Sequence, residues 1–178
     1  MIDRAAALWP RPPRNAELRA ELLRRQEADQ AVRLVPASER TPEHGQQWRA
    51  VDAANSEWLR ATIGSYGWPG ESMVSPAGAS AAWLIAQHSD HQPDFQRECL
   101  DLLAAAVTSG DADPRHGALL EDRVLVAQGR SQIFGTHTAG PGRRRGTRTE
   151  SDSGSGQGRS AAHRLGVRPA GDIHPASQ

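Results

Sequence analysis

The sequence has no lysine and a single cysteine, Cys99, among its 178 residues. A lone cysteine excludes an intrachain disulfide and a zinc site built on several cysteines. We expect Cys99, which falls on the apolar face of a predicted helix, to be a buried and unreactive thiol. All 21 basic residues are arginine, which is typical of a GC-rich genome and indicates no particular chemistry.

Long apolar runs are also missing. No segment approaches the roughly 20 apolar residues of a membrane span, and arginine and proline interrupt the N-terminal "MIDRAAALWPRPPR", unlike a secretory signal. We therefore expect a cytoplasmic protein with no membrane partner. Three common enzyme signatures are absent as well: a glycine-rich phosphate loop, a Gly-x-Ser-x-Gly turn and a His-Glu-x-x-His zinc helix.

Charge and composition divide the chain near its last quarter. Residues 15–135 carry 11 arginines against 17 acidic residues, whereas residues 136–178 carry 7 arginines against 3 acidic residues. The final segment is rich in glycine and has few large aliphatic side chains, so it cannot bury enough surface to offset its ordering entropy. We predict a disordered arm over 1–14, a helical domain over 15–136 and a disordered Gly/Arg/Ser-rich tail over 137–178.

Apolar residues recur at three- and four-residue spacing through the central part of the chain, which predicts amphipathic helices. Local signals mark their ends, because Asn15 and Asp113 suit N-caps and Pro93 suits a first helical turn. The predicted fold class is mainly α, a compact bundle of about five helices with a short extended segment at "SQIFGTH". The expected helices begin near Asn15, Gln46, Ser75, Pro93 and Pro114, and they end near Arg33, Ile63, Asp90, Ser109 and Gln128.

Polar residues gather where the third predicted helix ends, in "AWLIAQHSDHQPDFQ" (residues 82–96). At 100° per residue, His88 shares a face with Ala81, Leu84 and Ile85. Polar groups on an otherwise apolar face are what a ligand pocket needs. The catalytic candidates are His88, Asp90 and His91, and the binding candidates are Gln87, His116, Arg123 and Gln132.

Three interpretations of these residues stay open. A histidine can act as a general base oriented by Asp90. Alternatively, His88 and His91 could join His116 or Asp90 as ligands of a catalytic zinc, which needs three of them. In the third interpretation, which we favour, the groups satisfy one another at helix ends, with Asp90 capping the next helix or pairing with Arg123. We assign no metal, and the cofactor is unknown.

Four segments carry a resemblance to a known family: "ELRAELLRRQEADQAVR", "VDAANSEWLRATIGSYGWPGES", "AAWLIAQHSDHQPDFQRECLDLL" and "ADPRHGALLEDRVLVAQGRSQIFGT". In this order they resemble domain of unknown function 6624, a bacterial family common in actinomycetes. The resemblance covers residues 15–136 and implies a mostly helical single domain, without an activity, cofactor or partner.

Two departures from the family pattern stand out. Gln92 occupies a position where relatives usually carry Asp, which is a better N-cap. Relatives typically follow a Gly-Thr-Gln segment with an ordered tail that contains aromatic and proline residues, whereas here "GTH" is followed by "TAGPGRRRGTRTESDSGSGQGRS". Such a switch is typical of a frameshift in a GC-rich gene and equally of a divergent tail, and both stay open.

These features do not specify a reaction or a ligand. We expect a soluble binding or interaction domain with a polar pocket around His88, which suits a small molecule or a protein partner. The alternative is a small hydrolase-like enzyme that uses His88 as general base or metal ligand, with Asp90, His91 and His116 in support. The basic run "GRRRGTR" (residues 142–148) lacks interleaved aromatic residues, so we do not expect specific nucleic-acid binding.

Overall fold

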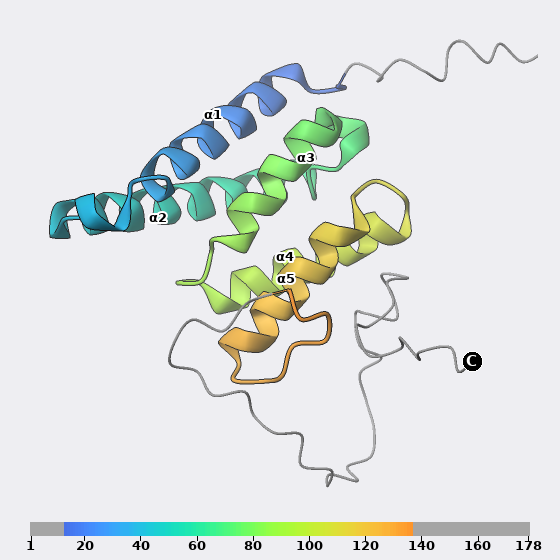
Figure 1. Cartoon of the computed structure of the whole chain (residues 1–178). Helices are drawn as coiled ribbons and strands as arrows, with labels where there is room; N and C mark the ends of the chain where they lie inside the picture. The colour runs from blue at the N-terminus through green and yellow to red at the C-terminus, as the bar shows by residue number, and fades with distance from the viewer. Residues whose placement is uncertain (1–12, 137–178) are drawn as a thin grey trace, which may run out of the picture.

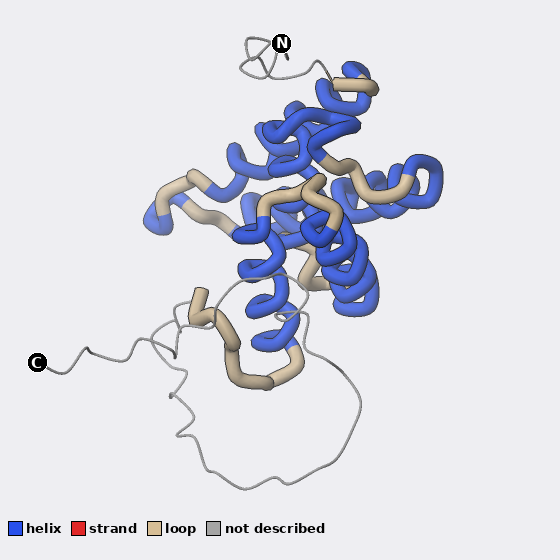
Figure 2. The backbone as a smooth tube through the Cα atoms, turned by 90° about the vertical axis from the view of Figure 1, so that its right-hand side faces the viewer, coloured by secondary structure: helices blue, strands red, loops and turns tan. Residues whose placement is uncertain are grey.

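A computed structural model of the chain describes residues 13–136, which form five α-helices (Figure 1). No strand occurs among these described residues (Figure 2), so the predicted mainly α fold is confirmed. The predicted tail and most of the predicted arm lie outside the described residues. The segment that suggests a frameshift lies outside them as well. The elements are α1 (Ala16–Arg33), a 3-10 helix η2 (Ala37–Glu39), α2 (Pro42–Tyr66), α3 (Glu71–Gln87), α4 (Pro93–Thr108) and α5 (Pro114–Ala127).

Two helices begin at the caps that the sequence predicts. Asn15 Oδ1 accepts a hydrogen bond from the Leu18 N–H at 2.9 Å, at the start of α1. Asp113 Oδ1 accepts from the Arg115 N–H, also at 2.9 Å, at the start of α5. Gln92 makes no side-chain cap at the start of α4, as expected for a poor capping residue. Each true cap satisfies an N–H that the helix leaves unpaired and contributes about 1 kcal/mol.

Helix α2 is longer than predicted at both ends. It begins at Pro42 instead of near Gln46, because the Thr41 hydroxyl accepts from the His44 N–H at 3.2 Å and proline suits the first turn. It continues to Tyr66 and stops at Gly67, where φ is 75°. Such a conformation is easy for glycine and ends the helix.

Helix α3 is kinked at Ser75, whose φ of 67° lies in a region that L-residues rarely adopt. Arg19 of α1 donates from Nε to the Ser75 hydroxyl at 2.9 Å and so ties the kink to α1. The regular part of α3 therefore begins at Pro76, close to the predicted start. The helix ends at Gln87, three residues before the predicted end at Asp90.

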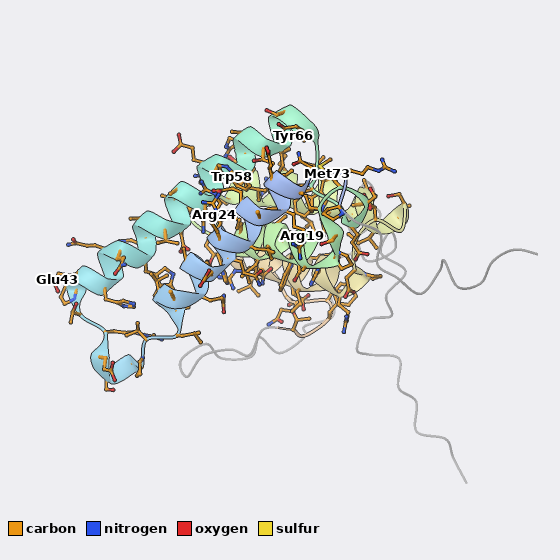
Figure 3. The ribbon with its side chains drawn as sticks, turned by 90° about the horizontal axis from the view of Figure 1, so that it is seen from above. Arg19, Arg24, Glu43, Trp58, Tyr66 and Met73 are labelled. Carbon is orange, nitrogen blue, oxygen red and sulfur yellow. The ribbon has the colours of Figure 1, made fainter. Side chains whose placement is uncertain are left out.

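Helix α3 lies at the centre and packs against all four other α-helices. On one side of it, α1 and α2 run antiparallel next to each other, as the view from above shows (Figure 3), and α4 packs on α5 on the other side (Figure 1). Cys99 of α4 is buried, and burial raises the pKa of its thiol to about 12, so it is the unreactive core thiol that we expect. The largest fully buried apolar side chains come from all five helices: Leu22, Leu59, Ile85, Phe95, Leu103 and Leu120.

None of the described helices combines the length and the apolar character needed to cross a bilayer.

Two helical glycines give a matched test of this packing. A Cβ at Gly78 would lie 2.8 Å from Val74 Cβ and 3.4 Å from Arg19 Cγ, so we expect Gly78→Ala to destabilise the domain by about 1–3 kcal/mol. A Cβ at Gly64 would meet no atom within 4 Å. Gly64→Ala should therefore stabilise the protein by about 0.5–1 kcal/mol, because alanine loses less backbone entropy in a helix. Chemical denaturation measures both effects, and shifts of the same sign and size would contradict the close approach at Gly78.

Candidate functional site

His88 stands at the C-cap of α3, where its ring reaches toward α1 instead of continuing the apolar stripe. Its Nδ1 lies 2.9 Å from Oδ1 of Asp29, a carboxylate that is only 1% exposed. Asp29 does not stand out in the sequence, because it lies among the many charges of "RRQEADQ". A signal is nevertheless present: Asp29 falls on the same buried stripe of α1 as Leu22 and Val32.

Asp29 is the centre of a charged group that we call the Asp29–His88 cluster, consisting of Asp29, Arg33, Asp52 and His88. Arg33 lies one turn after Asp29 on α1, and its Nη1 is 2.6 Å from Asp29 Oδ1. Its Nη2 donates to Asp52 Oδ1 of α2 at 2.8 Å. Asp29 Oδ2 accepts from Gln30 Nε2 at 2.8 Å. The buried carboxylate is thus paired and hydrogen-bonded, as a buried charge requires.

The cluster joins three helices, because Asp29 and Arg33 lie on α1, Asp52 lies on α2 and His88 caps the end of α3. A second contact fixes this meeting point, because the Ser56 hydroxyl of α2 is 2.7 Å from the Ser89 hydroxyl, one residue after His88. Ser56 also donates to the Asp52 carbonyl at 2.8 Å. The segment after α3 is thereby held against α2 one turn after Asp52.

Two atoms of the cluster have no partner in the described part of the chain and belong to side chains that are 15–16% exposed. His88 Nε2 has no hydrogen-bond partner among residues 13–136 and is not buried, and the same is true of Asp52 Oδ2. The contact of Nδ1 with the Asp29 carboxylate favours the tautomer that carries its proton on Nδ1. In that tautomer Nε2 presents a lone pair, which can accept a hydrogen bond or a proton.

Asp90, in the loop between α3 and α4, forms a separate ion pair with Arg123 of α5. Arg123 Nε donates to Asp90 Oδ1 at 2.8 Å, and Nη2 contacts the second carboxylate oxygen. Gln96 Nε2 adds a bond to Asp90 Oδ1 at 3.0 Å and bonds to the carbonyls of Ala86 and Gln87, both at 3.2 Å. This network fixes the loop between α3 and α4 to α5. It matches the pairing of Asp90 with Arg123 in the structural interpretation.

The Asp90 pair gives a pH-dependent prediction. Burial by itself raises the pKa of Asp90, but the hydrogen bonds from Arg123 and Gln96 and the charge of Arg123 outweigh it and lower that pKa. A carboxylate with a lowered pKa in the folded state stabilises the fold above its unfolded pKa, and this contribution is lost as the pH falls through the folded value. We expect Asp90→Asn to make stability less dependent on pH below about 4. Denaturation curves of both proteins at several acidic pH values measure this, and parallel acid limbs would contradict it.

The other sequence candidates lie apart from the Asp29–His88 cluster or do not contact it. His116 stacks on Trp83 of α3 with ring centroids 4.2 Å apart, and burial lowers the pKa of His116 more than the nearby Asp113 raises it. His91 is exposed, with its ring beside Gln92. Gln87 is buried and its Oε1 has no hydrogen-bond partner in the described part of the chain. Gln132 is half-buried in the segment after α5.

These positions bear on the zinc interpretation. Within residues 13–136 no group of three or more His, Cys, Asp or Glu residues is arranged to hold a metal ion. His88 is engaged by Asp29, His116 stacks on Trp83 and His91 faces outward. The structure does not bring the three histidines together.

Asp122 has a structural contact that the sequence does not reveal. Its carboxylate is completely buried and accepts hydrogen bonds from the N–H groups of Ile133, Phe134 and Thr136 at 2.7–2.9 Å, and from the Thr136 hydroxyl at 2.9 Å. The predicted extended segment is irregular, and Asp122 holds it against α5. Asp122 is therefore occupied and offers no carboxylate to His88.

Comparison with known proteins identifies the family of this chain. Residues 16–139, well over half of the chain, match the family described as "Family of unknown function (DUF6624)". No curated protein and no solved structure matches the chain.

Proposed function

The chain belongs to the family of unknown function DUF6624, and we propose that it is a binding domain that recognises a small polar ligand at the Asp29–His88 cluster. One observation carries the proposal: Asp29 holds His88 by Nδ1 at 2.9 Å, while Nε2 has no hydrogen-bond partner among the described residues and the side chain is 15% exposed. Fixing one ring nitrogen on a buried carboxylate orients the other, as in sites where histidine recognises a ligand or a metal. A histidine that served only packing would have no need of an oriented, accessible nitrogen.

A small ligand fits this surface better than a protein partner does. Only two large hydrophobic side chains of the described residues are strongly exposed, Leu34 (76%) and Tyr66 (57%). Leu34 follows the end of α1 and Tyr66 ends α2, so the antiparallel arrangement puts them at opposite ends of the pair. Protein interfaces usually need a contiguous apolar patch. We propose the bacterial cytoplasm as the setting of this function, in line with the sequence-based expectation.

A ligand screen with two matched histidine variants tests the proposal. The full-length protein and its His88→Gln and His91→Gln variants are screened by ligand-observed NMR against small molecules carrying amine, hydroxyl, carboxylate or phosphate groups. We expect ligands that bind the wild type and His91→Gln but are lost in His88→Gln. His91 is the control because it is exposed and three residues away. Binding that never depends on His88 would contradict the proposal.

A second candidate function is a hydrolase-like reaction in which His88 acts as general base. The same Asp29–His88 contact favours it, because a carboxylate that holds Nδ1 leaves Nε2 to take a proton from water. In this version Asp29 orients the histidine, instead of Asp90, which is bound to Arg123. An activity lowered by about 10²–10⁴ in His88→Gln and unchanged in His91→Gln, measured on activated esters, would support it. Equal activity in the two variants would oppose it.

A further inference from the structure

We propose that Arg33 is a positioning residue of the Asp29–His88 cluster, which controls the protonation of His88 by neutralising the carboxylate that both side chains contact. This inference rests on the proposed function and deepens it by naming the residue that regulates the site. A histidine presents a lone pair to a ligand, or acts as a general base, only when its ring is neutral.

Arg33 and His88 contact the same carboxylate oxygen. Asp29 Oδ1 lies 2.9 Å from His88 Nδ1 and 2.6 Å from Arg33 Nη1. The two nitrogens are therefore no further apart than the sum of these two distances. A proton on Nε2 would make the ring a cation, and two cations at this separation repel each other. The Arg33 guanidinium thus opposes the protonation of His88.

The burial of Asp29 makes this competition important. Asp29 is only 1% exposed, so its charge requires a partner inside the protein. Its second oxygen accepts a hydrogen bond from Gln30 Nε2 at 2.8 Å, but Gln30 is neutral and supplies no charge. Arg33 and His88 are the basic side chains within ion-pair distance of Asp29 in the described part of the chain. Because Arg33 supplies the positive charge, Asp29 does not need a protonated His88.

Contacts that do not involve His88 keep Arg33 in this position. Its Nη2 donates to Asp52 Oδ1 of α2 at 2.8 Å, and its guanidinium lies 4.9 Å from the Trp48 ring centroid. Asp52 shares the guanidinium with Asp29, so it weakens the effect of Arg33 on His88 without removing it. The guanidinium therefore stays beside Asp29 whether or not His88 carries a second proton.

The remaining charged side chains around this contact do not replace Arg33. Asp90, in the loop after His88, interacts with the ring through its charge but is neutralised by its ion pair with Arg123. Arg40 donates from Nη2 to the Arg33 carbonyl at 3.4 Å and has no carboxylate partner among residues 13–136. Its side chain is exposed, so solvent and salt screen its charge, which acts in the same direction as that of Arg33.

The titration of the His88 ring, followed by NMR in the full chain, tests the inference. The ring resonances, assigned with His88→Gln, are recorded between about pH 5 and 9 in the wild type, Arg33→Gln and Arg33→Lys. We expect the titration midpoint of His88 to be at least about one pH unit higher in Arg33→Gln, because Asp29 then takes its positive partner from the ring. Arg33→Lys keeps the charge and should keep the midpoint close to that of the wild type.

An arginine outside the cluster provides the matched control. Arg24 lies on the same helix, is exposed and pairs with Glu21, so Arg24→Gln should leave the midpoint of His88 unchanged. Equal midpoints in Arg33→Gln and the wild type would overturn the inference. A rise in Arg33→Lys as large as that in Arg33→Gln would also overturn it, because lost packing and not lost charge would then be the cause.

Asp52→Asn keeps the inference testable if Arg33→Gln does not fold. This variant leaves the Arg33 guanidinium to Asp29 alone, so the midpoint of His88 should move in the opposite direction, to lower pH. A midpoint that stays the same or rises in Asp52→Asn would overturn the inference.

The failure of this inference can be distinguished from the failure of the proposed function. The titration requires no ligand, so a midpoint that does not respond to Arg33 would overturn the role of Arg33 and leave His88 as a binding residue. Screened ligands that bind without His88 would overturn the proposed function, whatever the midpoint of the ring.

Discussion

Asp122→Ala is expected to lower the free energy of unfolding by about 3–5 kcal/mol, the largest effect we predict for a single polar residue. Both oxygens of this fully buried carboxylate accept two hydrogen bonds each from the segment between Ile133 and Thr136. Hydrogen bonds to a charged group stabilise a fold more than bonds between neutral groups. The contributions of these four bonds do not simply add, because the N–H groups of the released segment can bond to water instead. Denaturation followed by circular dichroism measures the loss.

An exposed aspartate provides the control for Asp122. Asp101 of α4 is exposed and makes no hydrogen bond or ion pair with the described residues, so Asp101→Ala should change stability by less than about 0.5 kcal/mol. Hydrogen exchange of the Ile133, Phe134 and Thr136 amides should accelerate only in Asp122→Ala. If the two variants were equally stable, Asp122 could not be what holds the segment on α5.

Asp29→Ala is expected to cost about 3 kcal/mol, the second largest effect. Removal of one partner of a buried ion pair leaves the other charge uncompensated, which typically costs 3–5 kcal/mol. We expect the lower end of that range, because Arg33 keeps its bond to Asp52 and is 15% exposed. The measurement is again the free energy of unfolding from denaturation curves.

Asp52, the second carboxylate bound by Arg33, provides the control for Asp29. Asp52 is 16% exposed, so Asp52→Ala leaves a charge that water can reach and should cost only about 1 kcal/mol. A cost for Asp29→Ala no larger than that for Asp52→Ala would mean that burial does not set the energetics of the cluster. It would then be unjustified to treat Asp29 as the residue that fixes the His88 ring.

The helices could be predicted because their signals are local. Asn15 and Asp113 bond to N–H groups two or three residues away, and Pro93 acts on its immediate neighbours, so a short stretch of sequence contains the whole interaction. The start of α2 was harder to predict, because Pro42 and Gly45 resemble a loop. Only the Thr41 hydroxyl, which caps the helix, distinguishes the two possibilities.

Only half of the Asp29–His88 cluster could be predicted from the sequence, and the reason is physical. His88 stands out because it falls on an apolar stripe, but its partner Asp29 is 59 positions away and meets it only through the packing of α1 on α3. No local spacing encodes that contact. Asp122 escapes notice for a related reason, since its partners are backbone N–H groups that any sequence would provide.

The position of the proton on the His88 ring shows whether Asp29 orients this histidine and leaves Nε2 with a free lone pair. Long-range ¹H–¹⁵N correlation spectra of the labelled full chain at neutral to mildly alkaline pH distinguish the two neutral tautomers. We expect that His88 carries its proton on Nδ1 in the wild type and loses this preference in Asp29→Ala, while exposed His91 is the same in both. A proton on Nε2 in the wild type would show that Asp29 does not hold the ring through a protonated Nδ1.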